Sequence, residues 1–325
     1  MDINIVMTFD DNYAIAAGVA ILSLLKHADS KHFYKIHVLY NNITEEHIGK
    51  LKEIIHWFSN AQIHFINMNN QYKEFSSSMK YPKEILYKLC LPSLFKKLDK
   101  VIVTDVDVVF RGNISSEYMN FQTDEYFAGV KQVQSDFHPP FSQNIKDNNL
   151  HFLVGAGYMI YNLKKMREDN IEEKCFQYLK KNIKYLKLPE QEVLSQICYP
   201  KIKLLPPKHM ALVSWWLYDD YLFEYDYVAN KEELEEARKD PIQIHYVNCS
   251  LKTVNKKVKP YTGKPWVDPF CPKADLWWFY LSQTPFFEEN FKVNLHINEE
   301  IVRARKKKTL KQRILKILNY LSQKQ

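Results

Sequence analysis

The 325-residue sequence has little cysteine and glycine and no long hydrophobic run. Its five cysteines are odd in number and include no C-x-x-C pair. This excludes a regular disulfide framework or zinc knuckle and is typical of a reducing cytoplasm. Seven glycines and 14 prolines are too few for a collagen-like or low-complexity chain. No stretch reaches about 18 consecutive apolar residues, and the first residues lack a basic region, so we expect neither a membrane span nor a signal peptide.

Positive charge is concentrated at one end of the chain. The segment from Arg303 to Gln325 contains nine basic residues and no acidic one. Subtracting these nine charges from the net charge of +7 leaves −2 for residues 1–302. We therefore expect a slightly acidic body that does not bind nucleic acid, followed by a basic appendage.

Strand and helix patterns alternate over roughly the first 130 residues. The expected strands span 3–9, 35–41, 62–68 and 100–110, and the expected helices span 13–27, a segment capped by Thr44, and 83–96. Further strands are expected at 126–132, 157–163, 202–207 and 241–247, and helices at 164–186, 190–198 and 276–283. This order predicts an α/β fold with a mainly parallel sheet covered by helices on both faces. No linker divides the chain, so we expect one fused unit.

Two acidic clusters lie towards the carboxyl ends of two of the expected strands, where ligands bind in such sheets. Asp10 and Asp11 follow the first strand, and Asp105 and Asp107 lie within the fourth segment. Two carboxylates spaced two apart on an extended segment point to the same side, and like charges so close favour a bound cation such as Mg²⁺ or Mn²⁺. The alternatives are a polar turn after a buried strand and a phosphatase motif of the haloacid-dehalogenase type. In the phosphatase, Asp105 would be the nucleophile and Asp107 the acid/base.

Several segments in a fixed order resemble family eight of the retaining glycosyltransferases, which includes bacterial lipopolysaccharide glucosyl- and galactosyltransferases and glycogenin. They are TFDDNY (8–13), YKLCLP (87–92), VIVTDVDVVFRGNI (101–114), GAGYMIYNLKKM (155–166), EQEVL (190–194), IHY (244–246), GKPW (263–266) and LWWFYLSQTPFFEE (276–289). The resemblance covers roughly residues 3–290 and implies a GT-A (Rossmann-like) nucleotide-sugar-binding fold. It also implies transfer of a hexose from a UDP-sugar with retained anomeric configuration.

The resemblance implies a divalent metal held by Asp105, Asp107 and His245. Two carboxylates, one imidazole and two pyrophosphate oxygens nearly fill an octahedron, and the nitrogen ligand favours Mn²⁺ over Mg²⁺. The alternative for His245 is a core histidine on a strand.

The resemblance further assigns residues to the nucleotide sugar. Contacts to the donor are implied for Thr8, Asp10, Asn12, Lys88, Val106, Gly263 and Lys264. The first three would contact uridine, although Asp11 or Asn12 is also suited to capping the next helix. Lys264 would supply a point charge to phosphate, the alternative being a surface turn closed by Pro265.

Glu190 and Gln191 are implied to lie at the reacting sugar. The carbonyl dipole of Gln191 would stabilise positive charge on the sugar, and Glu190 would bind sugar hydroxyls. The alternative is an exposed first helical turn with acids placed for the helix dipole.

Three positions depart from the family pattern. Lys88 replaces an arginine and loses its bidentate fork, Gly155 replaces an asparagine, and residues 127–132 lack an aspartate. These departures touch the donor-sugar or acceptor pocket, so they leave the sugar undetermined and keep open a catalytically inactive nucleotide-sugar-binding relative. The basic stretch between His245 and Lys264 fits either a loop that closes over the diphosphate or a solvated insertion.

The basic tail has an amphipathic pattern. Its apolar residues, Leu310, Ile314, Leu315, Ile317, Leu318 and Leu321, share one helical face. This is typical of a helix lying on an anionic membrane surface, the alternative being a helix packed on the body or on a partner. We expect a glycosyltransferase domain over 1–290 and a membrane-associating tail over 291–325. The expected protein is cytoplasmic, peripheral to the inner membrane, and transfers glucose or galactose to a lipid-linked glycan such as lipopolysaccharide core.

Overall fold

The structure is a computed structural model that describes residues 1–69, 71–78, 82–134, 152–216, 229–247, 263–268 and 271–289. The tail expected over 291–325 and the basic stretch 248–262 lie outside the described residues. The predictions made for these two segments therefore stay predictions.

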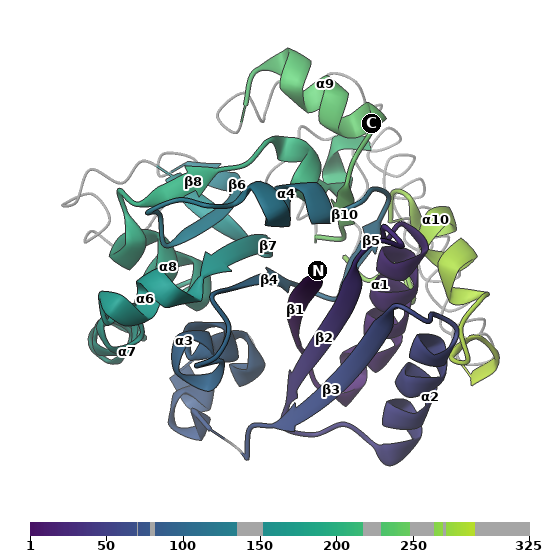
Figure 1. Cartoon of the computed structure of the whole chain (residues 1–325), viewed down its shortest axis with the longest axis horizontal. Coiled ribbons are helices and arrows are strands. Elements are labelled where there is room, and N and C mark those ends of the chain that lie inside the picture. The colour runs from purple at the N-terminus through teal and green to yellow at the C-terminus, as the bar shows by residue number, and fades with distance from the viewer. Residues whose placement is uncertain are drawn as a thin grey trace, which may run out of the picture.

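A seven-stranded sheet forms the centre of the molecule (Figure 1). Its strands are β1 (Asp2–Thr8), β2 (Phe33–Tyr40), β3 (Ala61–Asn67), β4 (Lys100–Thr104), β6 (Phe127–Gln134), β7 (Phe152–Asn162) and β8 (Ile202–Leu204). Their order is β3-β2-β1-β4-β7-β6-β8. Only β7 runs antiparallel to its neighbours, β4 and β6, while the other pairs are parallel. The predicted α/β fold with a mainly parallel sheet is confirmed.

The strand predicted over 100–110 is wrong as a single element. It is divided into β4 and β5 (Val108–Phe110), and β5 belongs to a second sheet with β10 (Gln243–His245) and β9 (Ala211–Leu212). Residues 105–107 lie between β4 and β5 and are held by hydrogen bonds to β7 and to the residue after β10. The Asp105 N–H donates to the Gly157 carbonyl at 3.3 Å, and the Tyr246 N–H donates to the Asp107 carbonyl at 2.9 Å. The D-x-D segment thus links the two sheets.

Helices cover both faces of the large sheet (Figure 1). The α-helices are α1 (Ala14–Lys26), α2 (Glu45–His56), α3 (Leu91–Leu94), α4 (Ser115–Asn120), α6 (Leu163–Glu168), α7 (Ile171–Asn182), α8 (Pro189–Cys198), α9 (Lys231–Lys239) and α10 (Ala274–Leu281). The 3₁₀ turns are η1 (Asp11–Tyr13), η2 (Lys73–Ser78), η3 (Lys83–Leu89), η4 (Pro207–Met210) and η5 (Val213–Trp216). Helices α1, α2 and α10 lie on one side, and α3, α6, α7 and α8 on the other.

Two of the predicted helices are interrupted, for reasons that lie in single residues. The segment 83–96 forms η3 and then the short α3, because Pro92 has no N–H to donate to the Lys88 carbonyl one turn earlier. The segment 164–186 forms α6 and α7, separated by Asn170 in the left-handed conformation at φ 54°. Asparagine tolerates that conformation better than most residues. The strands predicted over 202–207 and 241–247 are shorter, as β8 and β10.

The alternation of strand residues divides the core into two clusters. On β1, Ile5 and Met7 pack under α1 and α2, while Val6 packs with η3 and α3 on the opposite face. Trp215 and Trp277 are fully buried in the cluster that includes α1 and α2. The four described cysteines, Cys90, Cys175, Cys198 and Cys271, are buried and free.

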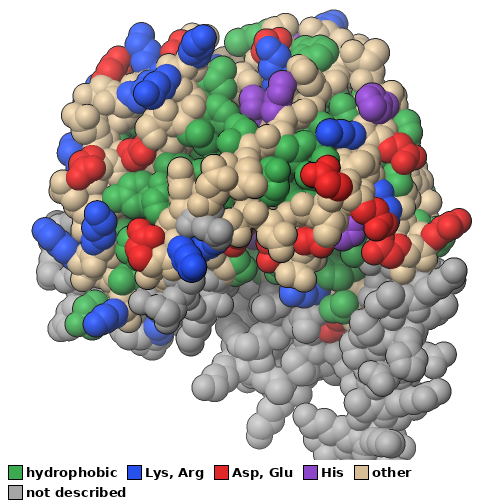
Figure 2. Space-filling model, turned by 90° about the horizontal axis from the view of Figure 1, so that it is seen from below, with side chains coloured by type: hydrophobic (Ala, Val, Ile, Leu, Met, Phe, Trp, Pro, Cys, Tyr) green, Lys and Arg blue, Asp and Glu red, His purple; other side chains and the backbone are tan. Residues whose placement is uncertain are grey.

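The surface of the described part is mixed in character. On the face shown in Figure 2, acidic and basic side chains are interspersed with hydrophobic ones. Among the described residues, no helix is both long enough and apolar enough to cross a membrane.

Candidate functional site

Asp105, Asp107 and His245 converge where the two sheets meet. His245 is the last residue of β10, and the antiparallel pairing of β10 with β5 places it opposite Val108, next to Asp107. Its Nε2 atom lies 3.5 Å from a carboxylate oxygen of Asp105 and 3.3 Å from one of Asp107. One ligand atom from each residue lies within 4.8 Å of the others. Two carboxylates and an imidazole at this separation fit a divalent cation with oxygen and nitrogen ligands.

The charge of the two aspartates acts on His245. Burial alone would lower the pKa of this histidine, but Asp107 and Asp105 outweigh burial and raise it. In the metal-free protein the two carboxylates therefore favour the protonated form of the imidazole. A metal ion must displace that proton, so metal affinity is expected to fall as the pH falls. The alternative that His245 is a core histidine does not account for its position between two carboxylates.

Gly157 on β7 leaves the room that the His245 ring occupies. A Cβ atom at this position would lie 2.6 Å from His245 Nδ1, closer than atoms pack. We expect Gly157→Ala to displace the ring and lower Mn²⁺ affinity by about 10- to 100-fold, the range typical when a metal ligand loses its support. Calorimetric titration with Mn²⁺ measures this effect.

The matched control is Gly49→Ala on α2, where a Cβ would meet nothing within 4 Å. This variant should keep the wild-type Mn²⁺ affinity, and alanine in a helix should raise its stability slightly. Equal Mn²⁺ affinities for Gly157→Ala and the wild type would contradict the placement of His245 in the metal site.

Lys88 places a buried positive charge beside the metal ligands. Its side chain is 1% exposed, and its ammonium donates to the Asp105 carboxylate and, at 3.1 Å, to the Ala156 carbonyl. Burial alone would lower the pKa of Lys88, but Asp105 and then Glu190 outweigh it and raise the pKa. Lys88 therefore stays charged, and the charges of Asp105 and Glu190 both act on it.

Glu190 and Gln191 occupy the first turn of α8. Glu190 is 6% exposed, so the alternative of an exposed helical turn is wrong for this residue. Burial raises the pKa of Glu190 to about 7, with Lys88 opposing the shift and Asp105 adding to it. Glu190 Oε2 and Gln191 Oε1 are buried and have no hydrogen-bond partner among the described residues. Buried polar atoms without partners mark a place where a polar ligand fits.

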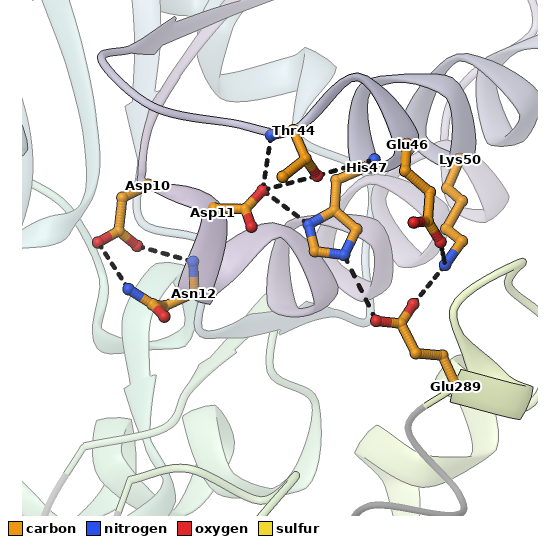
Figure 3. Close-up of polar contacts among 8 residues, drawn as sticks. All are labelled: Asp10, Asp11, Asn12, Thr44, Glu46, His47, Lys50 and Glu289. Atoms are coloured by element: carbon orange, nitrogen blue, oxygen red, sulfur yellow. Dashed lines mark hydrogen bonds and ion pairs between the residues drawn. The ribbon is translucent and has the colours of Figure 1, made fainter.

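In the loop after β1, Asp10 and Asp11 make different hydrogen bonds (Figure 3). Asp10 accepts hydrogen bonds at 3.1 Å from the backbone N–H and from the side-chain amide of Asn12. The structure thus makes Asp10 the cap of η1, and the expectation that Asp11 or Asn12 caps this helix is wrong. Thr8 is half-buried at the end of β1. All these residues lie at the carboxyl edge of the parallel strands.

Asp11 instead ties the loop to the start of α2 (Figure 3). It accepts from the Thr44 N–H at 2.8 Å and lies 2.8 Å from His47 Nδ1. Burial alone would raise the pKa of Asp11, but the bonds from Thr44 and His47 outweigh it and lower the pKa. The Thr44 hydroxyl also accepts from the His47 N–H, which confirms Thr44 as the cap of α2.

A surface cavity of about 410 Å³ lies beside this loop. It is lined by Asp10, Asp11, Asn12, Asn41, Asn42, Pro82, Lys83 and Glu84. The sequence reasoning missed the last five. The sequence pattern could have predicted Asn41 and Asn42. Both follow β2, which pairs in parallel with β1, so they lie at the same edge of the sheet as Asp10. Lys83 and Glu84 begin η3, and no local pattern placed that turn against the loop.

The remaining predicted donor contacts lie in different surroundings. Lys264 is exposed, and its ammonium lies 5.1 Å from the centroid of the Tyr13 ring. Burial and then the charges of Asp107, Asp10 and Asp105 raise the pKa of Tyr13 to about 12. Tyr13 is therefore close to Asp105 and Asp107. Lys264, whose ammonium lies over the Tyr13 ring, is on the same side of the site. Gly263 is buried.

Val106 differs from the other predicted contacts because its side chain is 4% exposed and packs in the core. Only its main chain is left to meet a nucleotide.

Solved structures share this architecture. The chain is similar to the WbbM bifunctional glycosyltransferase in its apo form, with a TM-score of 0.72 and 22% identity over 90% of this chain and 51% of that one. It spans only about half of that protein. It is also similar to the galactosyltransferase LgtC bound to donor and acceptor sugar analogues, with a TM-score of 0.64 and 17% identity over 87% of this chain and 96% of that one. The fold is the GT-A fold of glycosyltransferases.

The chain belongs to Glycosyl transferase family 8, whose family model matches residues 4–266. It is 23% identical over 270 residues to lipopolysaccharide 1,2-glucosyltransferase of Escherichia coli, covering 82% of this chain and 73% of the relative. It is 24% identical over 287 residues to general stress protein A of Bacillus subtilis, covering 86% and 93%. The protein is therefore a glycosyltransferase. The family model matches residues 4–266, which include both Asp105 and Asp107. This match excludes the alternative of a haloacid-dehalogenase-type phosphatase.

Proposed function

We propose that the protein is a metal-dependent, retaining hexosyltransferase. It transfers glucose or galactose from a UDP-sugar to a lipid-linked glycan such as lipopolysaccharide core. The observation that carries this proposal is the convergence of Asp105, Asp107 and His245 beside the buried Lys88. The names of two similar proteins, a lipopolysaccharide glucosyltransferase and a galactosyltransferase, support the class of sugar and acceptor.

The nucleotide part of the donor lies along the carboxyl edge of the sheet. Uridine binds in the cavity beside Asp10 and Asn12, with Thr8 at the end of β1. The diphosphate lies near Lys264, where the absence of a side chain at Gly263 lets the backbone approach. The main chain of Val106 meets the nucleotide between the two metal-ligating aspartates.

Asp105, Asp107 and His245 hold Mn²⁺ or Mg²⁺, which offsets the charge that develops on the departing diphosphate. Lys88 adds a second positive charge and positions the Asp105 carboxylate. Glu190 holds hydroxyl groups of the sugar, and the Gln191 carbonyl stabilises positive charge at the anomeric carbon.

Retention follows if the acceptor attacks the face from which the diphosphate leaves. The bond between the acceptor oxygen and the anomeric carbon forms as the bond from that carbon to the phosphate oxygen breaks. The proton of the acceptor hydroxyl moves to the leaving diphosphate.

The alternative is a relative that binds a nucleotide sugar but does not transfer it. The departures from the family pattern at Lys88 and Gly155 favour this alternative. Incubation with UDP-glucose or UDP-galactose, Mn²⁺ and a lipopolysaccharide core acceptor distinguishes the two. We expect an α-linked product by NMR, since both donors are α-configured. A β-linked product would overturn retention, and binding of the donor without product would support the inactive relative.

We also propose that the protein is cytoplasmic and binds the inner membrane through the tail over 291–325, while residues 1–290 carry the catalytic site. The amphipathic pattern and the nine basic residues support this attachment. Deleting residues 303–325 should abolish sedimentation with anionic phosphatidylglycerol vesicles and leave donor hydrolysis unchanged. Phosphatidylcholine vesicles are the control and should bind neither protein. Equal sedimentation of both proteins with anionic vesicles would contradict the proposal.

A further inference from the structure

Gly155 on β7 leaves space that two side chains from other elements fill. A Cβ atom at Gly155 would overlap the methyl group of Met210 and lie 2.5 Å from Gln132 Oε1. Gln132 comes from β6 and Met210 from the end of η4. The amide of Gln132 therefore stands next to the position where the family pattern has an asparagine side chain.

The backbone of β6 and β7 is irregular at this point. Lys131 pairs with Val154 and Val133 pairs with Leu153, so Gln132 is an extra residue in a bulge of β6. On the other side of Lys131, Gly129 pairs with Met159, which leaves β7 residues 155–158 opposite a single residue of β6. Bulges commonly re-aim a side chain beside a functional site. Here the bulge directs the Gln132 amide over Gly155.

The carbonyl oxygen of this amide is unpaired within the described part of the chain. Gln132 Oε1 is buried and accepts no hydrogen bond from the described residues. A buried acceptor without a donor is costly, so this oxygen favours a ligand that donates a hydrogen bond. A sugar hydroxyl group is such a donor.

The position of Gln132 relative to the metal ligands fits a sugar. Gly155 and Gly157 are two residues apart on β7, so the space above both lies on one face of the strand. His245 Nδ1 fills the space over Gly157, and Met210 contacts both positions. The Gln132 amide and the His245 ring therefore lie over neighbouring positions on one face of β7. A hexose attached to a diphosphate at the metal ligands places its hydroxyl groups in this region.

We propose that Gln132 is a specificity-determining residue that accepts a hydrogen bond from a hydroxyl group of the donor hexose. Met210 and Gly155 shape the space beside it. This inference rests on the proposed function, because it takes a UDP-hexose as the ligand of the site.

The test compares the binding of UDP-hexose and of UDP to Gln132→Leu in the presence of Mn²⁺, by calorimetry. Leucine has a similar volume and lacks the acceptor. We expect the affinity for the preferred UDP-hexose to fall about tenfold, with the affinity for UDP unchanged. The preference between UDP-glucose and UDP-galactose should shrink. The melting temperature should change little, since the Gln132 carbonyl accepts no hydrogen bond from the described residues.

Gln177→Leu on α7 is the matched control, because Gln177 lies on the surface and donates to Glu173 at 2.9 Å. It should change neither affinity. If Gln132→Leu does not fold, Gln132→Asn withdraws the amide by one methylene and should weaken UDP-hexose binding in the same direction.

Unchanged UDP-hexose affinity in the folded variant would overturn the inference. So would a wild-type protein that binds UDP-hexose no more tightly than UDP. Failure of the proposed function has a different signature, which is wild-type protein that binds UDP-hexose more tightly than UDP but forms no glycan product.

Discussion

Asp107→Asn is expected to lower Mn²⁺-dependent release of UDP from the donor by about 100- to 1,000-fold, the loss typical when one group that stabilises developing charge is removed. The substitution keeps the shape of the side chain and removes its charge. The variant should also bind Mn²⁺ more weakly, because His245 Nε2, 3.3 Å from Asp107, and Asp105 would remain as the only charged or imidazole ligands of the described cluster. Steady-state turnover and Mn²⁺ titration measure the two effects.

The control for this prediction is Asp99→Asn. The Asp99 side chain is 80% exposed and makes only a long contact of 3.9 Å with Arg167 among the ion pairs of the described residues. This variant should match the wild type in both turnover and metal affinity. Wild-type Mn²⁺ affinity in Asp107→Asn would contradict the assignment of the metal site.

Lys88→Met should destabilise the metal-free protein by about 3 kcal/mol, as expected when one partner of a buried ion pair is removed. Asp105 and Glu190 would lose the positive charge that acts on both. The pKa of Glu190, about 7 in the wild type, should rise further, so this residue is protonated at pH 6 and takes on an uncompensated charge as the pH rises. The loss of stability should therefore be larger at pH 8 than at pH 6.

Urea unfolding with a chelator, at both pH values, measures this difference in the free energy of unfolding. Added Mn²⁺ should restore part of it, because the cation neutralises Asp105. Lys231→Met is the control, since its 3.6 Å ion pair with Glu235 lies on the surface and contributes about 0.5 kcal/mol or less. Equal losses for the two lysine variants would show that the Lys88 ion pair contributes little to stability.

Local periodicity was enough to predict the first three strands of the fold. The segments predicted at 3–9, 35–41 and 62–68 are β1, β2 and β3, because each is a short apolar or alternating run bounded by polar residues. Periodicity could not divide 100–110, since β4 and β5 are both apolar. Their separation depends on hydrogen bonds to β7 and to the residue after β10, which are remote in sequence.

The functional site, like the fold, could be predicted from local sequence only in part. Asp105 and Asp107 were recognised from their spacing, but the pairing of β5 with β10, which brings in His245, spans more than a hundred residues. Only the resemblance to the family pointed to His245.

Gln132 was missed because its position depends on the bulge in β6 and on the space over Gly155. The two departures noted from the sequence, a glycine for an asparagine and a missing aspartate, lie together in this one place.

The most direct measurement is release of UDP from a panel of nucleotide sugars by the full chain, with Mn²⁺ and with a chelator. Water replaces the acceptor weakly in such an assay, so slow release is enough for detection. The proposed function predicts release from one UDP-hexose that requires Mn²⁺ and stops when the chelator is added. Equal release in the chelator would contradict the role of Asp105, Asp107 and His245. No release from any donor, even with a glycan acceptor present, would contradict sugar transfer itself.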